Sequence, residues 1–440
     1  MSRDWKRIPV EQWLEGSPTS EDVRDLIQFL TEQGTFQFPK LPNGLFAAAA
    51  GEGADFDVSG YQNVWLRDNV QIAWAHWAVH QDLTTTVRCL QALTEFYIRH
   101  RQRFVSVIDG TADFRNPMNR PHIRFNGLDL TEVSEKWAHA QNDALGYFLW
   151  LSCRLIHEGT ISIQDAAWDI FSLLVRYWAT IQVWQDEDSG HWEETRKVAA
   201  SSIGCALAGL QELRTLMQQP AVQQLLAAQP CPATTQDVDR LIEHCDRAMR
   251  AILPAECIQQ DVSKFRRYDA ALLFLIYPLN VIGDRAIEDQ ILSDVVQQLQ
   301  GPYGIRRYPG DSYWCADYRD LLAADQRTAD FSDSLGARDQ LLRPGMEAQW
   351  CIFDPIISCI YGKRWQISGD PSDLKAHVTA AQRSLCQMTR EGDRFVPYRC
   401  PESRFCEKGA WIPNDITPLL WTQGNLLQAL SMLADHLERV

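Results

Sequence analysis

The sequence predicts an all-α fold whose helices are arranged as an (α/α)6 toroid. Three observations favour this fold. About twelve segments show helical periodicity, strand alternation is confined to short pieces such as residues 394–399, and no Gly/Ser/Pro-rich linker divides the 440 residues. Six inner helices covered by six outer ones would use all of these segments, so we expect a single domain over residues 1–440. A two-domain helical protein is the alternative.

The first three helices illustrate the pattern. Residues 17–34 open with Ser and Thr capping candidates and stop at Gly34, and we assign them to a helical N-terminal extension over residues 1–40. Residues 70–81 carry Trp and Ala on overlapping faces, as suits an inner helix that is buried nearly all round. Residues 84–104 have a basic end, which is favourable for the helix dipole.

Nine further helices complete the prediction. They are expected near residues 139–157, 163–184, 200–218, 235–252, 266–278, 284–300, 347–361, 373–390 and 418–438. The segment 217–237 is rich in Gln, Ala and Pro, and we interpret it as a surface excursion between helices rather than as a domain boundary. No βαβ unit or GxGxxG turn is present.

Composition narrows the function. The net charge of −15 argues against nucleic acid and anionic membranes as partners, whereas a neutral sugar is compatible with it. The 16 Trp indicate either a large aromatic core or platforms for sugar rings. The 12 Cys show no zinc-binding spacing, and the N-terminus lacks the apolar stretch of a signal peptide, so we expect a cytoplasmic protein with mostly free thiols.

In a toroid the pocket lies at one end and is lined by inter-helix loops, so candidate site residues should flank helices. In YQNVWLRD (61–68), Arg67 and Asp68 can bind sugar hydroxyls, or Asp68 can serve as a helix cap. In WAHAQNDALG (137–146), polar groups crowd beside Trp137, and these too are either ligand-binding residues or helix caps.

The stretch GHWEETR (190–196) sets Glu193 directly after Trp192. A carboxyl beside an indole is partly desolvated, which raises its pKa and suits a general acid. We expect Glu194 to point elsewhere and Arg196 to keep it ionised. The alternative is that both carboxyls face solvent.

Two later stretches carry further candidates. RRYPGDSYW (306–314) mixes charged and aromatic residues around a Pro-Gly turn and is either a pocket rim or an exposed turn. In RCPESRFCEKGAWIPNDITPLLW (399–421), Glu402 is a candidate for a second carboxylate. Glu347, in GMEAQW, is the rival for that role.

Taken in order, these motifs resemble glycoside hydrolase family 15, the glucoamylase family, which includes glucoamylase-like domains of the phosphorylase kinase alpha and beta subunits. The resemblance runs from about residue 44 to 432, and HWEETRKVAASSIG is nearer to the phosphorylase kinase pattern. It implies Glu193 as general acid and Glu402 as general base. The implied substrate-binding residues are Trp65, Arg67, Asp68, Trp137, Gln141, Asp143, Trp192, Arg307, Tyr308 and Trp421.

The resemblance implies an inverting, exo-acting hydrolase that releases glucose from α-glucosides or oligosaccharides, with no metal or organic cofactor. Two departures matter. Residues 138–140 read AHA where fungal relatives carry an Arg, and Glu402 lies in Pro-Glu-Ser rather than Ser-Glu-Gln. The alternatives are a sugar-binding or regulatory scaffold without activity, and a hydrolase of trehalose or of a glucosylated small solute.

Overall fold

A ring of inner helices forms the centre of the molecule. The computed structural model describes residues 5–50, 59–79, 83–228, 232–333 and 335–439. Each of six helices contacts the next, and the last contacts the first, which closes the ring. In ring order they are α3 (Leu66–Ala78), α6 (Asn142–His157), α8 (Ala200–Met217), α11 (Leu273–Ile276), α15 (Phe353–Ser368) and α17 (Leu420–Leu437).

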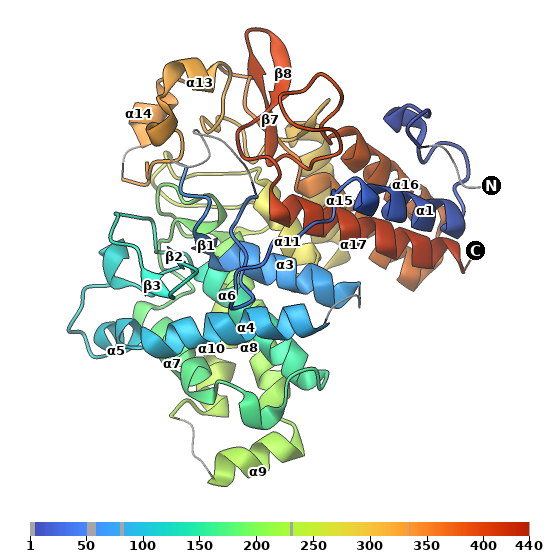
Figure 1. Ribbon diagram of the computed structural model, residues 1–440. Coiled ribbons are helices and arrows are strands. Elements are labelled where there is room, and N and C mark those ends of the chain that lie inside the picture. The colour runs from blue at the N-terminus through green and yellow to red at the C-terminus, as the bar shows by residue number, and fades with distance from the viewer. Residues whose placement is uncertain (1–4, 51–58, 80–82, 229–231, 334, 440) are drawn as a thin grey trace.

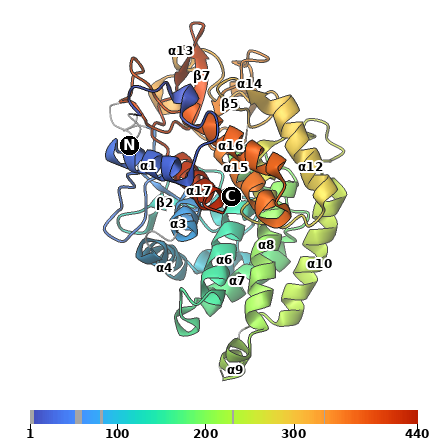
Figure 2. The same ribbon diagram turned by 90° about the vertical axis from the view of Figure 1, so that its right-hand side faces the viewer.

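A second set of helices covers this ring, as Figures 1 and 2 show. They alternate with the inner helices along the chain. They are α1 (Ser20–Glu32), α4 (Leu83–Arg99), α7 (Trp168–Ile181), α10 (Thr235–Ile252), α12 (Arg285–Asp294) and α16 (Pro371–Cys386). The predicted (α/α)6 toroid is therefore confirmed.

The division into two layers follows from the distribution of apolar residues. In α6, fourteen of the sixteen residues are buried, whereas α10 buries only five of its eighteen residues along one stripe. A helix that is apolar all round can be stable only inside, and an amphipathic helix covers it. The helix α1, predicted as part of an N-terminal extension, packs against α17 in the outer layer.

Shorter helices connect these elements. They are α5 (Gln102–Ile108), α9 (Pro220–Ala228), α13 (Tyr318–Leu321) and α14 (Leu335–Asp339). The helix α9 lies within the expected excursion 217–237 and projects from the lower end of the molecule in both views (Figures 1 and 2). The predicted helix 266–278 is much shorter than expected, because Tyr277 is extended ahead of Pro278 and ends the helix at Ile276.

Two small antiparallel sheets lie between the helices. One joins β1 (Val64–Trp65), β2 (Arg124–Asn126) and β3 (Thr131–Glu132). The other joins β4 (Gln300–Gly301), β5 (Gly304–Ile305), β6 (Gln349–Trp350), β7 (Ser403–Glu407) and β8 (Ala410–Pro413).

The strand expected at residues 394–399 was wrong. This segment folds back on Thr389, whose backbone N–H donates to Arg399 O and whose backbone oxygen accepts from Tyr398 N–H, so the segment makes a loop rather than a strand pair. The clear hairpin lies further on, where β7 pairs with β8 from Arg404 opposite Pro413 to Glu407 opposite Ala410.

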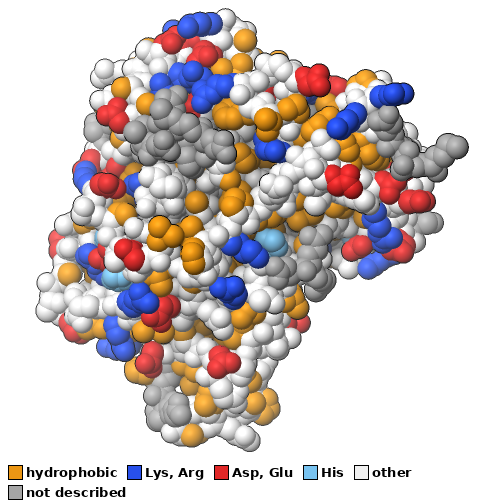
Figure 3. All heavy atoms as spheres, viewed as in Figure 1, with side chains coloured by type: hydrophobic (Ala, Val, Ile, Leu, Met, Phe, Trp, Pro, Cys, Tyr) orange, Lys and Arg blue, Asp and Glu red, His pale blue; other side chains and the backbone are white. Residues whose placement is uncertain are grey.

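The outer surface mixes both signs of charge. In Figure 3, acidic and basic side chains are interspersed over the face shown. Among the described residues, no helix combines the length and the apolar character needed to cross a membrane.

Candidate active site

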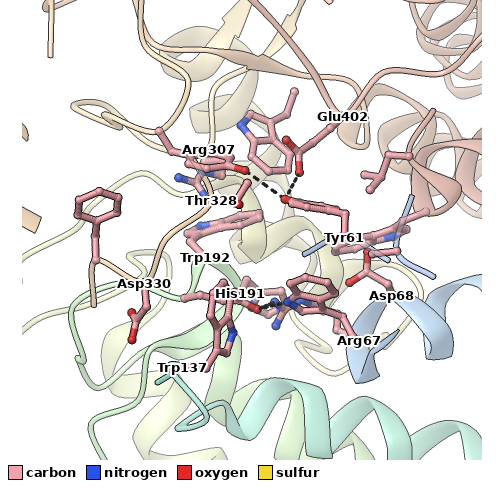
Figure 4. A pocket seen from close by; sticks show the side chains of 18 of the residues that line it. Tyr61, Arg67, Asp68, Trp137, His191, Trp192, Arg307, Thr328, Asp330 and Glu402 are labelled. Atoms are coloured by element: carbon pink, nitrogen blue, oxygen red, sulfur yellow. Dashed lines mark hydrogen bonds and ion pairs between the residues drawn. The ribbon is translucent and has the colours of Figure 1, made fainter. Parts of the chain in front are cut away.

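The principal pocket opens where the inner helices begin. Trp65, Arg67 and Asp68 come from the start of α3, and Trp421 comes from the start of α17. The pocket encloses about 780 Å³, including its open mouth. Its lining is Ala48, Tyr61, Trp65, Arg67, Asp68, Trp137, His191, Trp192, Glu193, Arg307, Tyr313, Thr328, Ala329, Asp330, Phe331, Arg338, Trp350, Glu402, Leu419 and Trp421 (Figure 4).

The carboxyl of Glu193 enters the pocket from a short turn. Residues 190–192 form a single helical turn, and Glu193 ends it in the left-handed conformation, with φ of 58°. Its Oε1 accepts hydrogen bonds from Trp65 Nε1 at 2.9 Å and from Arg67 Nη2 at 3.4 Å. Burial raises the pKa of Glu193 above its ordinary value, and the charge of Arg67 opposes this. The side chain remains 17% exposed, so the carboxyl can meet a ligand.

The carboxyl of Glu402 enters from the other side, immediately before β7. Its Oε1 accepts from the hydroxyl of Tyr61 at 2.8 Å, and its Oε2 accepts from Asn414 Nδ2 at 2.6 Å. Burial raises the pKa of Glu402 to about 7, although these two donors favour the ionised form. In Figure 4 Glu402 and Arg67, the partner of Glu193, lie on opposite sides of the pocket.

Arg67 is held from behind. Its Nη1 pairs with Asp143 and donates to Gln141 Oε1 at 3.1 Å. Neither Gln141 nor Asp143 lines the pocket, so both contact Arg67 rather than the cavity. Asp68 does line the cavity, and burial raises its pKa to about 7 against the opposing charge of Arg67.

Helix capping does not explain these polar residues. Asp68 lies within the first turn of α3, whose N-cap is Trp65, and no side chain caps that helix. Asn142 and Asp143 lie inside α6, whose N-cap is Gln141, again without a side-chain cap. The capping alternative for these two stretches is therefore wrong.

Glu194 points away from the pocket into a cluster of cations. Its Oε1 accepts from Arg307 at 3.1 Å, from Arg338 at 2.8 Å and from the Tyr308 hydroxyl at 2.5 Å, and Arg266 lies 3.3 Å from Oε2. Burial alone would raise the pKa of Glu194, but the guanidinium groups outweigh it and lower the pKa to about 2. We call Glu194 with Arg266, Arg307, Tyr308 and Arg338 the Glu194 cluster.

Two expectations about this region need correction. Arg196 does not keep Glu194 ionised, because its guanidinium instead donates to the backbone oxygen of Arg115. The alternative in which both neighbouring carboxyls face solvent is also wrong, because Glu194 is fully buried.

The remaining predicted residues divide between the cavity wall and its support. Trp137, Trp192, Arg307 and Trp421 line the pocket, whereas Tyr308 contacts Glu194 behind it. Glu347 lies outside the lining; its Oε1 accepts from Gly310 N–H at 3.0 Å, and Arg306 lies 3.6 Å from its Oε2.

Several lining residues were not predicted. Tyr61 and Tyr313 lie within stretches that drew attention for other residues, so a closer inspection of their hydroxyls would have found them. Thr328, Asp330 and Arg338 lie in a stretch with no distinctive motif, and only the fold brings them to the pocket. Within the described part of the chain, no cluster of three or more His, Cys, Asp or Glu side chains is arranged to hold a metal ion.

Comparison with known proteins supplies the family context. The model of the family described as glycosyl hydrolases family 15 matches residues 30–317. The probable phosphorylase b kinase regulatory subunit alpha of Caenorhabditis elegans is 25% identical over 436 residues, which cover 91% of this chain and 32% of that protein. The chain thus spans about a third of that relative's length.

Solved structures share the fold. A wild-type glycosidase superposes with a TM-score of 0.61 at 17% identity, covering 95% of this chain and 98% of the other. A related glycosidase in complex with glucose gives 0.62 at 16% identity with the same coverage. Glucoamylase from Saccharomycopsis fibuligera gives 0.59 at 12% identity, covering 96% and 98%.

Proposed function

The chain belongs to the glycosyl hydrolases of family 15, and on that premise we propose that it is an inverting, exo-acting glycosidase releasing glucose from the non-reducing end of soluble α-glucosides. Glu193 acts as general acid and Glu402 as general base. One observation carries the proposal: these two carboxyls line the same pocket from different sides, in different hydrogen-bonding surroundings.

The reaction needs one proton donor and one proton acceptor. Glu193 gives its proton to the glycosidic oxygen as the bond to the anomeric carbon breaks. Glu402 takes a proton from a water that attacks that carbon from the opposite face, which inverts its configuration. Both products leave neutral, and the proton gained by Glu402 returns to Glu193 through solvent.

The surroundings of each carboxyl support its role. Burial beside Trp65 and Trp137 favours the protonated form of Glu193. Two donors, the Tyr61 hydroxyl and the Asn414 amide, favour the ionised form of Glu402 and fix its orientation. The glucose unit is held by Arg67 and Asp68, which offer donors and an acceptor to its hydroxyls.

The test is product analysis. The protein is incubated with maltose, longer maltooligosaccharides, trehalose and 4-nitrophenyl α-glucoside, and the released glucose is followed by proton NMR. We expect β-glucose to appear first and to mutarotate afterwards. Initial α-glucose would contradict inversion, and the absence of glucose from every substrate would contradict the proposed activity.

A second candidate is favoured by the relative from Caenorhabditis elegans, which is described as a regulatory subunit. In that case the pocket binds a glucoside without cleaving it. Calorimetry distinguishes the two: a protein that binds maltose but releases no glucose over a day is a sugar-binding scaffold.

A further inference from the structure

Four carboxylates line the pocket, and one has no role in the proposed function. Asp68 binds glucose, Glu193 donates a proton and Glu402 accepts one, which leaves Asp330. Its Oδ1 accepts the backbone N–H of Ser332 at 2.8 Å. Its Oδ2 is buried, and no group among the described residues donates a hydrogen bond to it. A buried carboxylate oxygen without a donor is costly unless a ligand satisfies it.

Asp330 lies on the side of the pocket away from the glucose-binding pair. In Figure 4 Asp68 and Arg67 lie at one side and Asp330 at the other, with Trp192 and Thr328 between them. Since Arg67 and Asp68 hold the glucose in the proposed function, a group bonded to its anomeric oxygen extends towards Asp330.

The chain around Asp330 is firmly anchored. We call residues 327–333 the rim segment. At one end the Thr328 hydroxyl donates to Ser59 O at 2.7 Å, and Arg327 Nη1 donates to Asp415 Oδ2 at 3.0 Å. At the other end Asp333 pairs with Lys136 across the mouth. The rim segment therefore holds the Asp330 carboxylate in a defined position.

No neighbouring carboxylate can replace Asp330 on this side. Glu194 is adjacent to Glu193 in the chain, but it is fully buried, and its Oε1 already accepts three hydrogen bonds. The rim segment also lies beyond residue 317, where the match to the family model ends. The role of Asp330 must therefore follow from its own geometry.

The chemistry of the missing donor can be narrowed. Arg124 and Lys136 already interact electrostatically with Asp330, so its charge is partly balanced and a cationic group is not required. A carboxylate oxygen accepts a hydrogen bond from any hydroxyl. Trp137 lines the same part of the cavity and offers an apolar face to a ring.

We propose that the rim segment forms the leaving-group half of the pocket and that Asp330 accepts a hydrogen bond from a hydroxyl of the leaving group. The substrate class is then an α-glucoside of a second sugar or of a small polyol. This inference rests on the proposed function, because that function fixes which side of the pocket holds the glucose.

The test compares two leaving groups on the same enzyme. Maltose offers hydroxyls to Asp330, whereas the 4-nitrophenyl group of an aryl α-glucoside offers none. Asp330→Ala should lower the ratio of kcat/KM for maltose to kcat/KM for the aryl glucoside about ten-fold, the size expected for a hydrogen bond to a charged group. Asp330→Asn keeps an acceptor for Ser332 N–H and should lower the ratio less.

The matched control is Asp325→Asn, which removes one negative charge from an exposed site outside the pocket and should leave the ratio unchanged. An unchanged ratio in both Asp330 variants, with wild-type turnover intact, overturns the inference and leaves the proposed function standing. If wild-type protein cleaves no glucoside, the proposed function fails. The inference is then decided by calorimetry, where Asp330→Ala must weaken maltose more than glucose.

Discussion

Two regions that meet at one peptide bond treat a carboxylate in opposite ways. On one side Glu193 faces the pocket among indoles, with one guanidinium 3.4 Å away, and burial raises its pKa. On the other side Glu194 is enclosed by the guanidinium groups of the Glu194 cluster, and its pKa is lowered to about 2. Both carboxyls are shielded from solvent, so the number of neighbouring cations decides the direction.

The backbone separates the two side chains. Glu193 adopts the left-handed conformation, with φ of 58°, which turns its side chain into the cavity while the next residue continues towards the interior. Such a conformation is uncommon for a residue other than glycine and costs free energy. The comparison indicates that this turn serves the site: it places a carboxyl that can be protonated beside one that stays ionised.

The largest expected effect is on catalysis at Glu193. Glu193→Gln keeps an oxygen for Trp65 Nε1 but removes the acidic proton, so we expect kcat to fall about 10⁴-fold on maltose, the upper range for general acid catalysis. The free energy of unfolding should change little, because no buried ion pair on the Glu194 side is lost. Steady-state kinetics and urea denaturation measure the two quantities.

The control for this variant is Glu135→Gln, whose side chain is 71% exposed. It should retain wild-type kinetics. If Glu193→Gln kept more than a tenth of wild-type kcat, Glu193 would not be the acid, and the pocket half of the comparison would lose its meaning.

The converse effect is expected at Glu194. Glu194→Gln leaves the cations of the Glu194 cluster without their shared counter-charge, so the free energy of unfolding should fall by about 3–5 kcal/mol. The exposed pair of Glu243 with Arg247 provides the contrast, and Glu243→Gln should cost only about 0.5 kcal/mol. Urea denaturation gives both values; equal losses would show that the Glu194 cluster contributes no more than a surface pair.

A smaller effect separates the two candidates for the base. Glu402→Gln should lower kcat about 100-fold, the lower range for general base catalysis. Glu347→Gln should change kcat less than two-fold, because Glu347 lies outside the pocket lining and its contact with Gly310 N–H can be kept by the amide oxygen. The reverse ranking would make Glu347 the base.

How far the sequence could predict this site depends on the distance over which each contact acts. The direction of Glu193 and the aromatic wall at Trp192 follow from neighbours in the chain, and the helical periodicity predicts the toroid. The partners of Glu194 lie 72 to 144 residues away, and Asp330 meets the pocket only through the fold. Arg196, the cation nearest in sequence, was therefore the wrong partner.

The opposition of Glu193 and Glu402 can be sharpened through pH. The hydroxyl of Tyr61 donates to Glu402 and favours its ionised form, which lowers a pKa that burial raises to about 7. Tyr61→Phe removes this donor, so the pKa of Glu402 should rise further, by about one unit for a hydrogen bond to a charged group. A general base must be ionised, so the acidic limb of kcat/KM should move to higher pH by that amount.

The alkaline limb should stay in place, because Glu193 accepts no hydrogen bond from Tyr61 and must remain protonated as before. The measurement is the pH profile of kcat/KM on 4-nitrophenyl α-glucoside, with Tyr303→Phe as the control, since that partly exposed tyrosine stacks on Trp411 outside the pocket. An acidic limb that stays fixed, or moves to lower pH, would separate Tyr61 from the base and leave the ionisation of Glu402 to Asn414 alone.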